Sequence, residues 1–180
     1  ITVPQTPSGL ASDDRTGRLY VAQPTLGILA VEPDGGAGFL VSIDAGQLGA
    51  WVGGLDLFPA ADGGAVLFSA APAEQKVIMH ILSGAQASFQ AALQFGPPDG
   101  GGGRVQSRFL DVFESPLPGF PKGLLVLQDE LTASYKVVSL VDVAAVTPLP
   151  EPPVPRTDGG VDGGVDGGRL FLDLLAGAVV

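Results

Sequence analysis

The chain has 180 residues, a formal net charge of −10 at pH 7, no cysteine and one histidine, His80. The acidic charge argues against nucleic acid or an anionic membrane surface as the main partner. Without cysteine there are no disulfides, thiolate metal sites or cysteine nucleophiles, and one histidine excludes a multi-histidine zinc site. No stretch reaches the roughly 18 apolar residues of a membrane span.

Three segments of similar pattern follow one another along the chain. Each contains an apolar strand, a turn with Gly or Pro, a stronger strand that ends in a polar residue, and a further strand. The 27 glycines and 16 prolines largely punctuate these runs, and a 46% hydrophobic content supplies a core. The segments are 8–36; 51–71 with 76–84 and 88–95; and 109–129 with 135–143.

The spacing of the three segments predicts the fold class. Gly9-Leu10 recurs as Gly54-Leu55, and Leu110-Asp111 opens the third segment. A period of roughly 40–55 residues built of short strands is typical of β-propeller blades. We therefore predict an all-β chain with about three propeller blades of four-stranded antiparallel sheets over residues 1–146. A β-sandwich is the alternative, because it also has short strands at regular spacing.

The last part of the chain differs in composition. Residues 147–168, TPLPEPPVPRTDGGVDGGVDGG, are rich in Pro, Gly and Asp, which predicts a linker. A calcium-binding glycine–aspartate repeat is the alternative, although its large apolar anchor residues are missing. The apolar residues 169–180 predict a strand that docks onto the sheet, or an adhesive end.

Four ordered blocks resemble the β-propeller phytases. SGLASDDRTGRLYVAQ (8–23) is similar to the family's blade opening, in which Gly-Leu or Gly-Met precedes Asp-Asp, a turn and Leu-Tyr-Ile/Val-Ala. WVGGLDLFPAADGGAVLFSAA (51–71) stands in the place of Asp-Ile-Glu-Gly-Leu, a Gly-rich turn and a strand ending in Ser-Ser-Gln-Gly. FLDVFESPLPGFPKGLLVLQDE (109–130) resembles Gly-Ile-Asp-Val and a later Gly-Leu-Leu/Phe-Val-x-Gln-Asp, and YKVVSLVDVAAV (135–146) resembles Phe-Lys-x-Val-Pro-Trp-x-x-Ile-Ala.

The resemblance implies a hydrolase and a mechanism. Enzymes of this family are six-bladed propellers that hydrolyse phytate on their top face. There, Asp and Glu carboxylates hold calcium ions, which bind the phosphates and activate a water. A substrate of such high negative charge is held by hard cations, and those need several oxygen ligands. By the same resemblance we expect calcium as the only cofactor and a secreted, periplasmic or cell-surface location.

Most of the family's carboxylate positions carry other residues here. The Asp and Glu of Asp-Ile-Glu-Gly-Leu fall on Trp51 and Gly53, a further Glu falls on Pro24, and Arg108 stands within the family's Asp-Thr-Asp-Gly-Ile-Asp. No catalytic residue is assigned. The acidic residues that remain as candidate metal ligands are Asp14, Asp111 and Asp129. The candidate substrate-binding cations are Lys76, Arg108 and Lys122.

Structural roles are the alternatives for these residues. Asp111 and Asp129 end strands, and Asp14 precedes a turn, where Asp side chains bond backbone N–H groups. Three separated cations more often lie on a solvated surface. Trp51 beside an apolar run is typical of packing, and His80 alternates with apolar residues in a strand.

About three blades match, whereas the resemblance implies a closed ring of six. The expected partners are therefore a missing propeller half or a second chain, and a phosphorylated small molecule. A start at Ile1 rather than Met is expected of a processed chain or a cut piece.

We predict a degenerate phytase-like propeller domain with a binding or structural role. The alternative is a calcium-dependent 3-phytase that hydrolyses phytate phosphomonoesters, with ligands from the three aspartates above and Glu74. A third reading is an adhesion or scaffold module.

Overall fold

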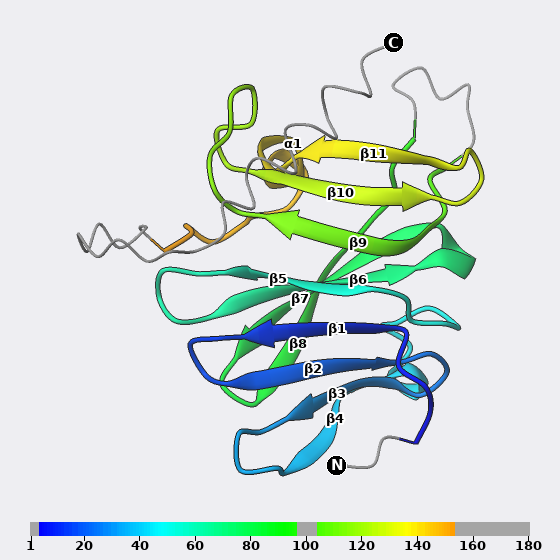
Figure 1. The fold of residues 1–180 in the computed structure, drawn as a ribbon, viewed down its shortest axis with the longest axis vertical. Helices are drawn as coiled ribbons and strands as arrows, with labels where there is room; N and C mark the ends of the chain where they lie inside the picture. The colour runs from blue at the N-terminus through cyan, green and yellow to red at the C-terminus, as the bar shows by residue number, and fades with distance from the viewer. Residues whose placement is uncertain (1–3, 97–103, 154–180) are drawn as a thin grey trace, which may run out of the picture.

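The computed structural model describes residues 4–96 and 104–153, which form three antiparallel sheets stacked in chain order along the long axis (Figure 1). Blade 1 consists of β1 (Gly9–Asp13), β2 (Arg18–Gln23), β3 (Gly27–Val31) and β4 (Ala37–Ser42). Blade 2 consists of β5 (Leu55–Pro59), β6 (Ala65–Ala71), β7 (Lys76–Ser83) and β8 (Gln86–Leu93). Blade 3 consists of β9 (Ser107–Phe113), β10 (Leu124–Asp129) and β11 (Ser134–Ser139), followed by the helix α1 (Leu140–Val146).

Each blade is a meander whose strands pair antiparallel with their neighbours in sequence. The first strands of the blades lie side by side, β1 against β5 and β5 against β9, and we call these three the inner strands. The prediction of an all-β chain with three propeller blades is confirmed. A two-layer sandwich is wrong, since the sheets form three successive layers.

Blade 3 departs from the predicted four strands. After β11 the chain turns into α1, because Ser139 has extended backbone and its Oγ accepts a hydrogen bond from the backbone N–H of Val141. This is the arrangement of a helix N-cap. Leu140 and Val143 of the helix are buried in the core of blade 3. Local capping and burial therefore favour a helix where the repeat predicts a strand.

Two hydrophobic cores join the blades. The first contains Tyr20 and Ile28 of blade 1 together with Leu57 and Leu67 of blade 2. The second contains residues of blades 2 and 3, among them Phe58, Phe68, Met79, Leu125 and Leu127. Strand β6 is buried along its whole length, because one blade covers each of its faces. That explains its continuous apolar run, where a half-exposed strand would alternate.

The start of the predicted linker lies against the blades. Leu149 packs on the second core, the backbone N–H of Ala61 donates to the carbonyl oxygen of Glu151 at 2.8 Å, and Gln90 donates to the carbonyl oxygen of Pro148. The rest of the linker prediction (154–168) and the apolar end 169–180 lie outside the described residues. In residues 4–96 and 104–153, no helix combines the length and the apolar character that crossing a membrane requires.

Candidate functional site

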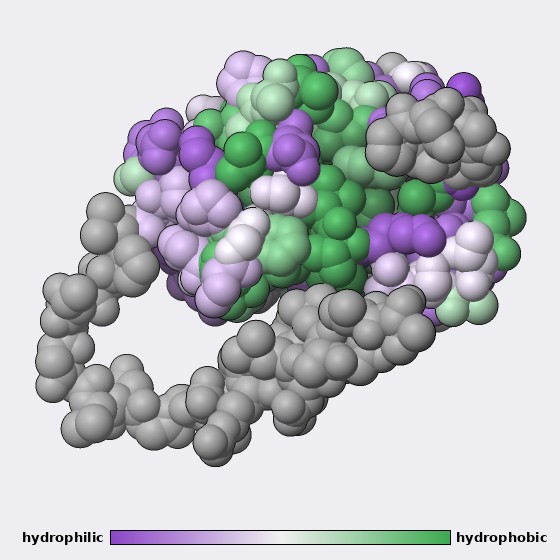
Figure 2. Space-filling model, turned by 90° about the horizontal axis from the view of Figure 1, so that it is seen from above, coloured by the Kyte–Doolittle hydropathy of each residue, from purple (hydrophilic) through white to green (hydrophobic). Residues whose placement is uncertain are grey.

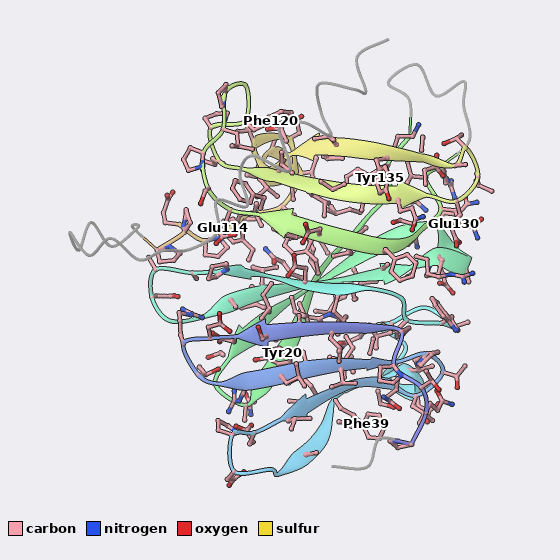
Figure 3. The ribbon with its side chains drawn as sticks, viewed as in Figure 1. Tyr20, Phe39, Glu114, Phe120, Glu130 and Tyr135 are labelled. Atoms are coloured by element: carbon pink, nitrogen blue, oxygen red, sulfur yellow. The ribbon has the colours of Figure 1, made fainter. Side chains whose placement is uncertain are left out.

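The inner strands carry different chemistry at their two ends. At the finishing ends, where β1, β5 and β9 end, acidic side chains gather around a cavity. At the starting ends, an arginine lies among aromatic and acidic groups. Figure 3 shows the two ends on opposite sides of the molecule, with Glu114 labelled at the finishing end and Glu130 at the starting end.

The finishing ends border a cavity of about 430 Å³. Its lining comes from all three blades and includes the carboxyl groups of Asp13, Asp14, Asp56, Asp111 and Glu114, together with Arg15. The stacking of the blades brings these carboxyl groups together, although they are far apart in the sequence. We call this cavity the acidic cavity.

Asp56 and Asp111 form a carboxyl pair across the junction of blades 2 and 3. The carboxyl group of Asp56 accepts hydrogen bonds from the backbone N–H of Val112 at 2.6 Å and from that of Leu57 at 2.8 Å. Burial, together with the hydrogen bond and like charge of Asp111, raises the pKa of Asp56 to about 7, although the two backbone hydrogen bonds act to lower it. Near neutral pH, Asp56 is therefore partly protonated.

Arg15 does not neutralise that pair, because its guanidinium is engaged elsewhere. It forms an ion pair with Asp13 at 3.2 Å and donates to the carbonyl oxygens of Ala60 at 3.0 Å and Gly64 at 2.8 Å. Burial by itself raises the pKa of Asp13, but the hydrogen bonds from Arg15 and Thr16 outweigh it and lower the pKa. Arg15 thus fastens the β1–β2 turn to blade 2.

At the starting ends, Arg108 is held by three contacts. Its guanidinium lies 5.2 Å from the ring centre of Trp51 and forms an ion pair with Glu130 at 3.1 Å. Its carbonyl oxygen accepts a hydrogen bond from the backbone N–H of Gly54 at 2.6 Å. A cation over an aromatic face is stabilised by the ring quadrupole.

The backbone at Gly53 leaves no room for a side chain. A Cβ atom there would lie 2.5 Å from the carbonyl oxygen of Arg108 and 3.1 Å from the Cβ of Ala70. Real Cβ atoms essentially never approach backbone so closely. The resemblance aligns a glutamate with this position, and the close approach of blades 2 and 3 explains why glycine stands there.

Asp129 has the turn role that its place at a strand end predicts, and this alternative is confirmed. Its carboxylate accepts from the backbone N–H of Leu131 at 3.2 Å and from Thr132 Oγ1 at 2.6 Å, and Lys136 lies 3.8 Å away. Only 3% of the residue is exposed. Burial acts to raise the pKa of Asp129, but these hydrogen bonds and Lys136 lower it overall.

The structure brings some predicted residues together and separates others. Asp14 and Asp111 line the acidic cavity, whereas Asp129 lies at the starting ends. Lys76 begins β7 and lies at the starting ends, as Arg108 does. Lys122 lies at the opposite end, 4.0 Å from Glu151.

Asp56 and Glu114 were missed as candidate site residues. Asp56 lies within the apolar strand sequence LDLF. A charged residue inside an apolar strand is the one feature of the sequence that could have indicated a functional role for it.

The donor set does not fit a metal site built on the three predicted aspartates, since they lie at opposite ends. In residues 4–96 and 104–153, no three Asp, Glu or His side chains are placed so that they could hold a metal ion. Calcium binding stays a prediction of the resemblance.

A family model described as Phytase matches residues 2–139, which is more than half of the chain. No curated protein matches it in a direct comparison. The family match spans all three blades and ends at the last residue of β11, so it covers the acidic residues of the cavity and the environment of Arg108. The chain therefore belongs to the phytase family.

Proposed function

We propose that this chain is a phytase-family propeller domain that does not hydrolyse phytate and instead has a binding or structural role. The observation that carries the proposal is the environment of Arg108. The resemblance places calcium-binding carboxylates at the starting ends, and there Arg108 is paired with Glu130 and stacked on Trp51.

Both the charge and the available space at the starting ends disfavour calcium binding. Calcium needs roughly six to eight oxygen ligands at short distance. A guanidinium adds a positive charge among them, and the carboxylate of Glu130 is engaged in the ion pair with Arg108. The backbone at Gly53 also excludes the side chain that the family has there. The added positive charge, the engaged carboxylate of Glu130 and the missing side chain at position 53 all disfavour a calcium array of the family type at the starting ends.

A calcium-dependent 3-phytase is the second candidate, and the acidic cavity favours it. Five carboxyl groups line about 430 Å³ there, including Asp14 and Asp111 from the predicted ligand set. Carboxylates are the ligands that calcium prefers. Against this candidate, Asp13 is paired with Arg15, and Asp56 and Asp111 interact with each other.

The deciding experiment measures phosphate released from phytate by the full chain, with calcium and with a chelator. We expect no release above the blank in either condition. Chelator-sensitive turnover that disappears in Asp111→Asn but persists in Arg108→Gln would overturn the proposal and select the second candidate. Both substituted side chains are accessible and polar, so each variant is expected to fold, which circular dichroism checks.

A binding role for a phosphorylated small molecule is tested separately by titrating phytate into the chain without metal. Measurable heat that is lost in Arg108→Gln and kept in Lys122→Gln supports a phosphate contact at the starting ends. Heat that is unchanged in both variants indicates phytate binding that does not depend on Arg108 or Lys122, and the absence of heat leaves the structural role. We also propose export from the cell, which family membership supports, and detection of the chain in the extracellular or periplasmic fraction of its source cells tests that step.

A further inference from the structure

Two hairpin turns of this chain share the sequence Asp-Gly-Gly-Ala and the same internal structure. They are residues 34–37 between β3 and β4, and residues 62–65 between β5 and β6. In both turns the backbone N–H of the second glycine donates to Oδ1 of the aspartate at 2.9 Å. The φ angle of the first glycine is 91° at Gly35 and 89° at Gly63. The two turns therefore present the same starting geometry to any reaction of the aspartate.

An aspartate followed by glycine isomerises without an enzyme. The nitrogen of Gly35 attacks Cγ of Asp34, and a C–N bond forms while the amide proton and the hydroxyl of the protonated carboxyl group leave as one water. The product is a five-membered succinimide. Water then adds to one of its two carbonyl carbons and breaks that carbon's bond to the nitrogen. Opening at the former backbone carbonyl gives isoaspartate, and opening at Cγ restores aspartate, so no other reactant is consumed.

Both turns are accessible to this reaction. Glycine has no Cβ to obstruct the approach of its nitrogen to the carboxyl carbon. A Cβ added to Gly35 or Gly63 would meet nothing within 4 Å, so both glycines lie in open space. Both turns lie on the left side of the molecule in Figure 1. Seen from above in Figure 2, that side is largely hydrophilic, which suits the water that the second step consumes.

The β5–β6 turn is fastened by bonds from two other parts of the chain. Arg15 in the β1–β2 turn donates to the carbonyl oxygen of Ala60 at 3.0 Å and to that of Gly64 at 2.8 Å. The backbone N–H of Ala61 donates to the carbonyl oxygen of Glu151 at 2.8 Å. These three bonds flank the aspartate–glycine peptide on both sides in the sequence. A rotation of that peptide therefore disturbs them.

The β3–β4 turn has no such fastening. In the part of the chain that the structure describes, no hydrogen bond or ion pair joins residues 33–36 to any residue outside 32–36. The nearest restraint is the ion pair of Glu32 with Arg18 at 2.9 Å, which holds a side chain and not the backbone of the turn. Turns with few outside contacts open locally at low free energy. The nitrogen of the first glycine is thus released more easily here.

We propose that Asp34 is a site of spontaneous isoaspartate formation in the folded chain, and that the contacts of Arg15 and Glu151 protect the same sequence at Asp62. Isoaspartate adds one methylene to the backbone between β3 and β4. It also removes the carboxylate acceptor from the N–H of Gly36, so the turn loses one of the hydrogen bonds that define it. The modification therefore loosens the outer hairpin of blade 1.

The first experiment incubates the full wild-type chain at neutral pH below its melting temperature and follows isoaspartate at each site. Chymotrypsin cuts at Phe39 and Trp51, which separates the two turns, and electron-transfer fragmentation distinguishes isoaspartate from aspartate at equal mass. Formation at Asp34 is expected to be about tenfold faster than at Asp62, since one retained hydrogen bond from a charged donor is enough for that factor. Equal rates, or a faster rate at Asp62, overturn the proposal.

The same measurement in denaturant removes the tertiary contacts. Because the two sites share the sequence Asp-Gly-Gly-Ala, their rates are then expected to be similar. A ratio between the sites that is as large in denaturant as in the folded chain would place its cause in the local sequence. That result overturns the protection assigned to the contacts.

Two arginine variants test the protection directly. Arg15→Gln removes two of the three bonds and is expected to raise the rate at Asp62 several-fold, with the rate at Asp34 unchanged. Arg18→Gln is the matched control, because it leaves the contacts of the β5–β6 turn in place, and the wild-type rate at Asp62 is expected. An unchanged rate at Asp62 in Arg15→Gln, or an equal rise in both variants, overturns the proposal. If circular dichroism shows that Arg15→Gln does not fold, the wild-type rates in the folded chain and in denaturant decide the question.

Discussion

The carboxyl groups of Asp56 on β5 and Asp111 on β9 face each other across the junction of blades 2 and 3, within the acidic cavity. Two backbone N–H groups hold Asp56 in place, so it cannot turn away from its neighbour without losing both hydrogen bonds. Desolvation and the like charge favour the neutral form of Asp56, which is why its pKa rises to about 7. The junction therefore contains a proton whose presence depends on pH.

The first prediction concerns this pair and pH. The pKa of Asp56 is higher in the folded chain, at about 7, than in the unfolded chain, so its contribution to stability is complete below about pH 4 and is lost as pH rises toward 7. In Asp111→Asn the like charge is removed and an amide can donate to Asp56. We expect this variant to melt at a higher temperature than wild type at pH 8, with a smaller difference at pH 4; thermal melts across pH measure both.

Asp14→Asn is the control for that comparison, because Asp14 lines the same cavity and its side chain accepts a hydrogen bond from Ser12. Its melting temperature is expected to follow the pH dependence of the wild type. A pH dependence that is identical in wild type and Asp111→Asn would contradict the role given to the pair.

The second prediction concerns His80, which is fully buried in β7. Neither ring nitrogen has a hydrogen-bond partner among the described residues, and the ring lies edge-on to Phe89 at 6.1 Å. Burial lowers the pKa of His80 to about 4. Stability from neutral His80 is thus present above about pH 6.5 and lost as pH falls toward 4. His80→Met is expected to be more stable than wild type at pH 5, and chemical denaturation at pH 5 and pH 8 tests this.

At pH 8 the same substitution is expected to change the free energy of unfolding less, because the imidazole is then neutral in both states. A loss of stability at both pH values would contradict this prediction. Lys76→Met, on the same strand, controls for adding a methionine to β7.

The third prediction concerns Gly53. Because a Cβ there would meet the carbonyl oxygen of Arg108, Gly53→Ala and Gly53→Glu are both expected to destabilise the chain, by about 1–3 kcal/mol or more. Gly53→Glu restores the family's residue but is not expected to create calcium binding. Gly38 is the matched control, since a Cβ there has open space within 4 Å. A Gly53→Glu chain that keeps its melting temperature and gains calcium-dependent stabilisation would refute this prediction.

The fourth prediction concerns Asp129. Asp129→Ala leaves the N–H of Leu131 and the hydroxyl of Thr132 without their acceptor, and the expected loss is about 1–3 kcal/mol in the free energy of unfolding at pH 7. The folded pKa of Asp129 is depressed, so the difference from wild type is present above about pH 4 and shrinks as pH falls below it. Denaturant unfolding at pH 7 and pH 3 measures it.

Glu130→Ala is the neighbouring control, with a far smaller expected effect, because the Glu130–Arg108 ion pair is partly exposed. Equal losses in the two variants would contradict a structural role for Asp129.

Local pattern was enough to predict the blades and the family. Strands such as RLYVAQ and LLVLQD, bounded by turns with glycine, proline and aspartate, are determined by neighbours in sequence. The repeat of these units predicted the three sheets, and the ordered blocks predicted the family that the match over 2–139 shows. The helix α1 was not predicted, because the N-cap of Ser139 overrides the repeat at that point.

The grouping of the charged residues was decided only by the tertiary structure. Asp14 and Asp111 share a cavity, while Asp129 lies at the other end, although all three follow or lie within similar strands. The physical reason is that such contacts depend on how the inner strands of successive blades stack against each other. The partners of Asp56 and Arg108 come from residues distant in sequence, Asp111 with Val112 for one and Trp51 with Glu130 for the other. Sequence alone determined which blades form, and the packing between them determined which charges meet.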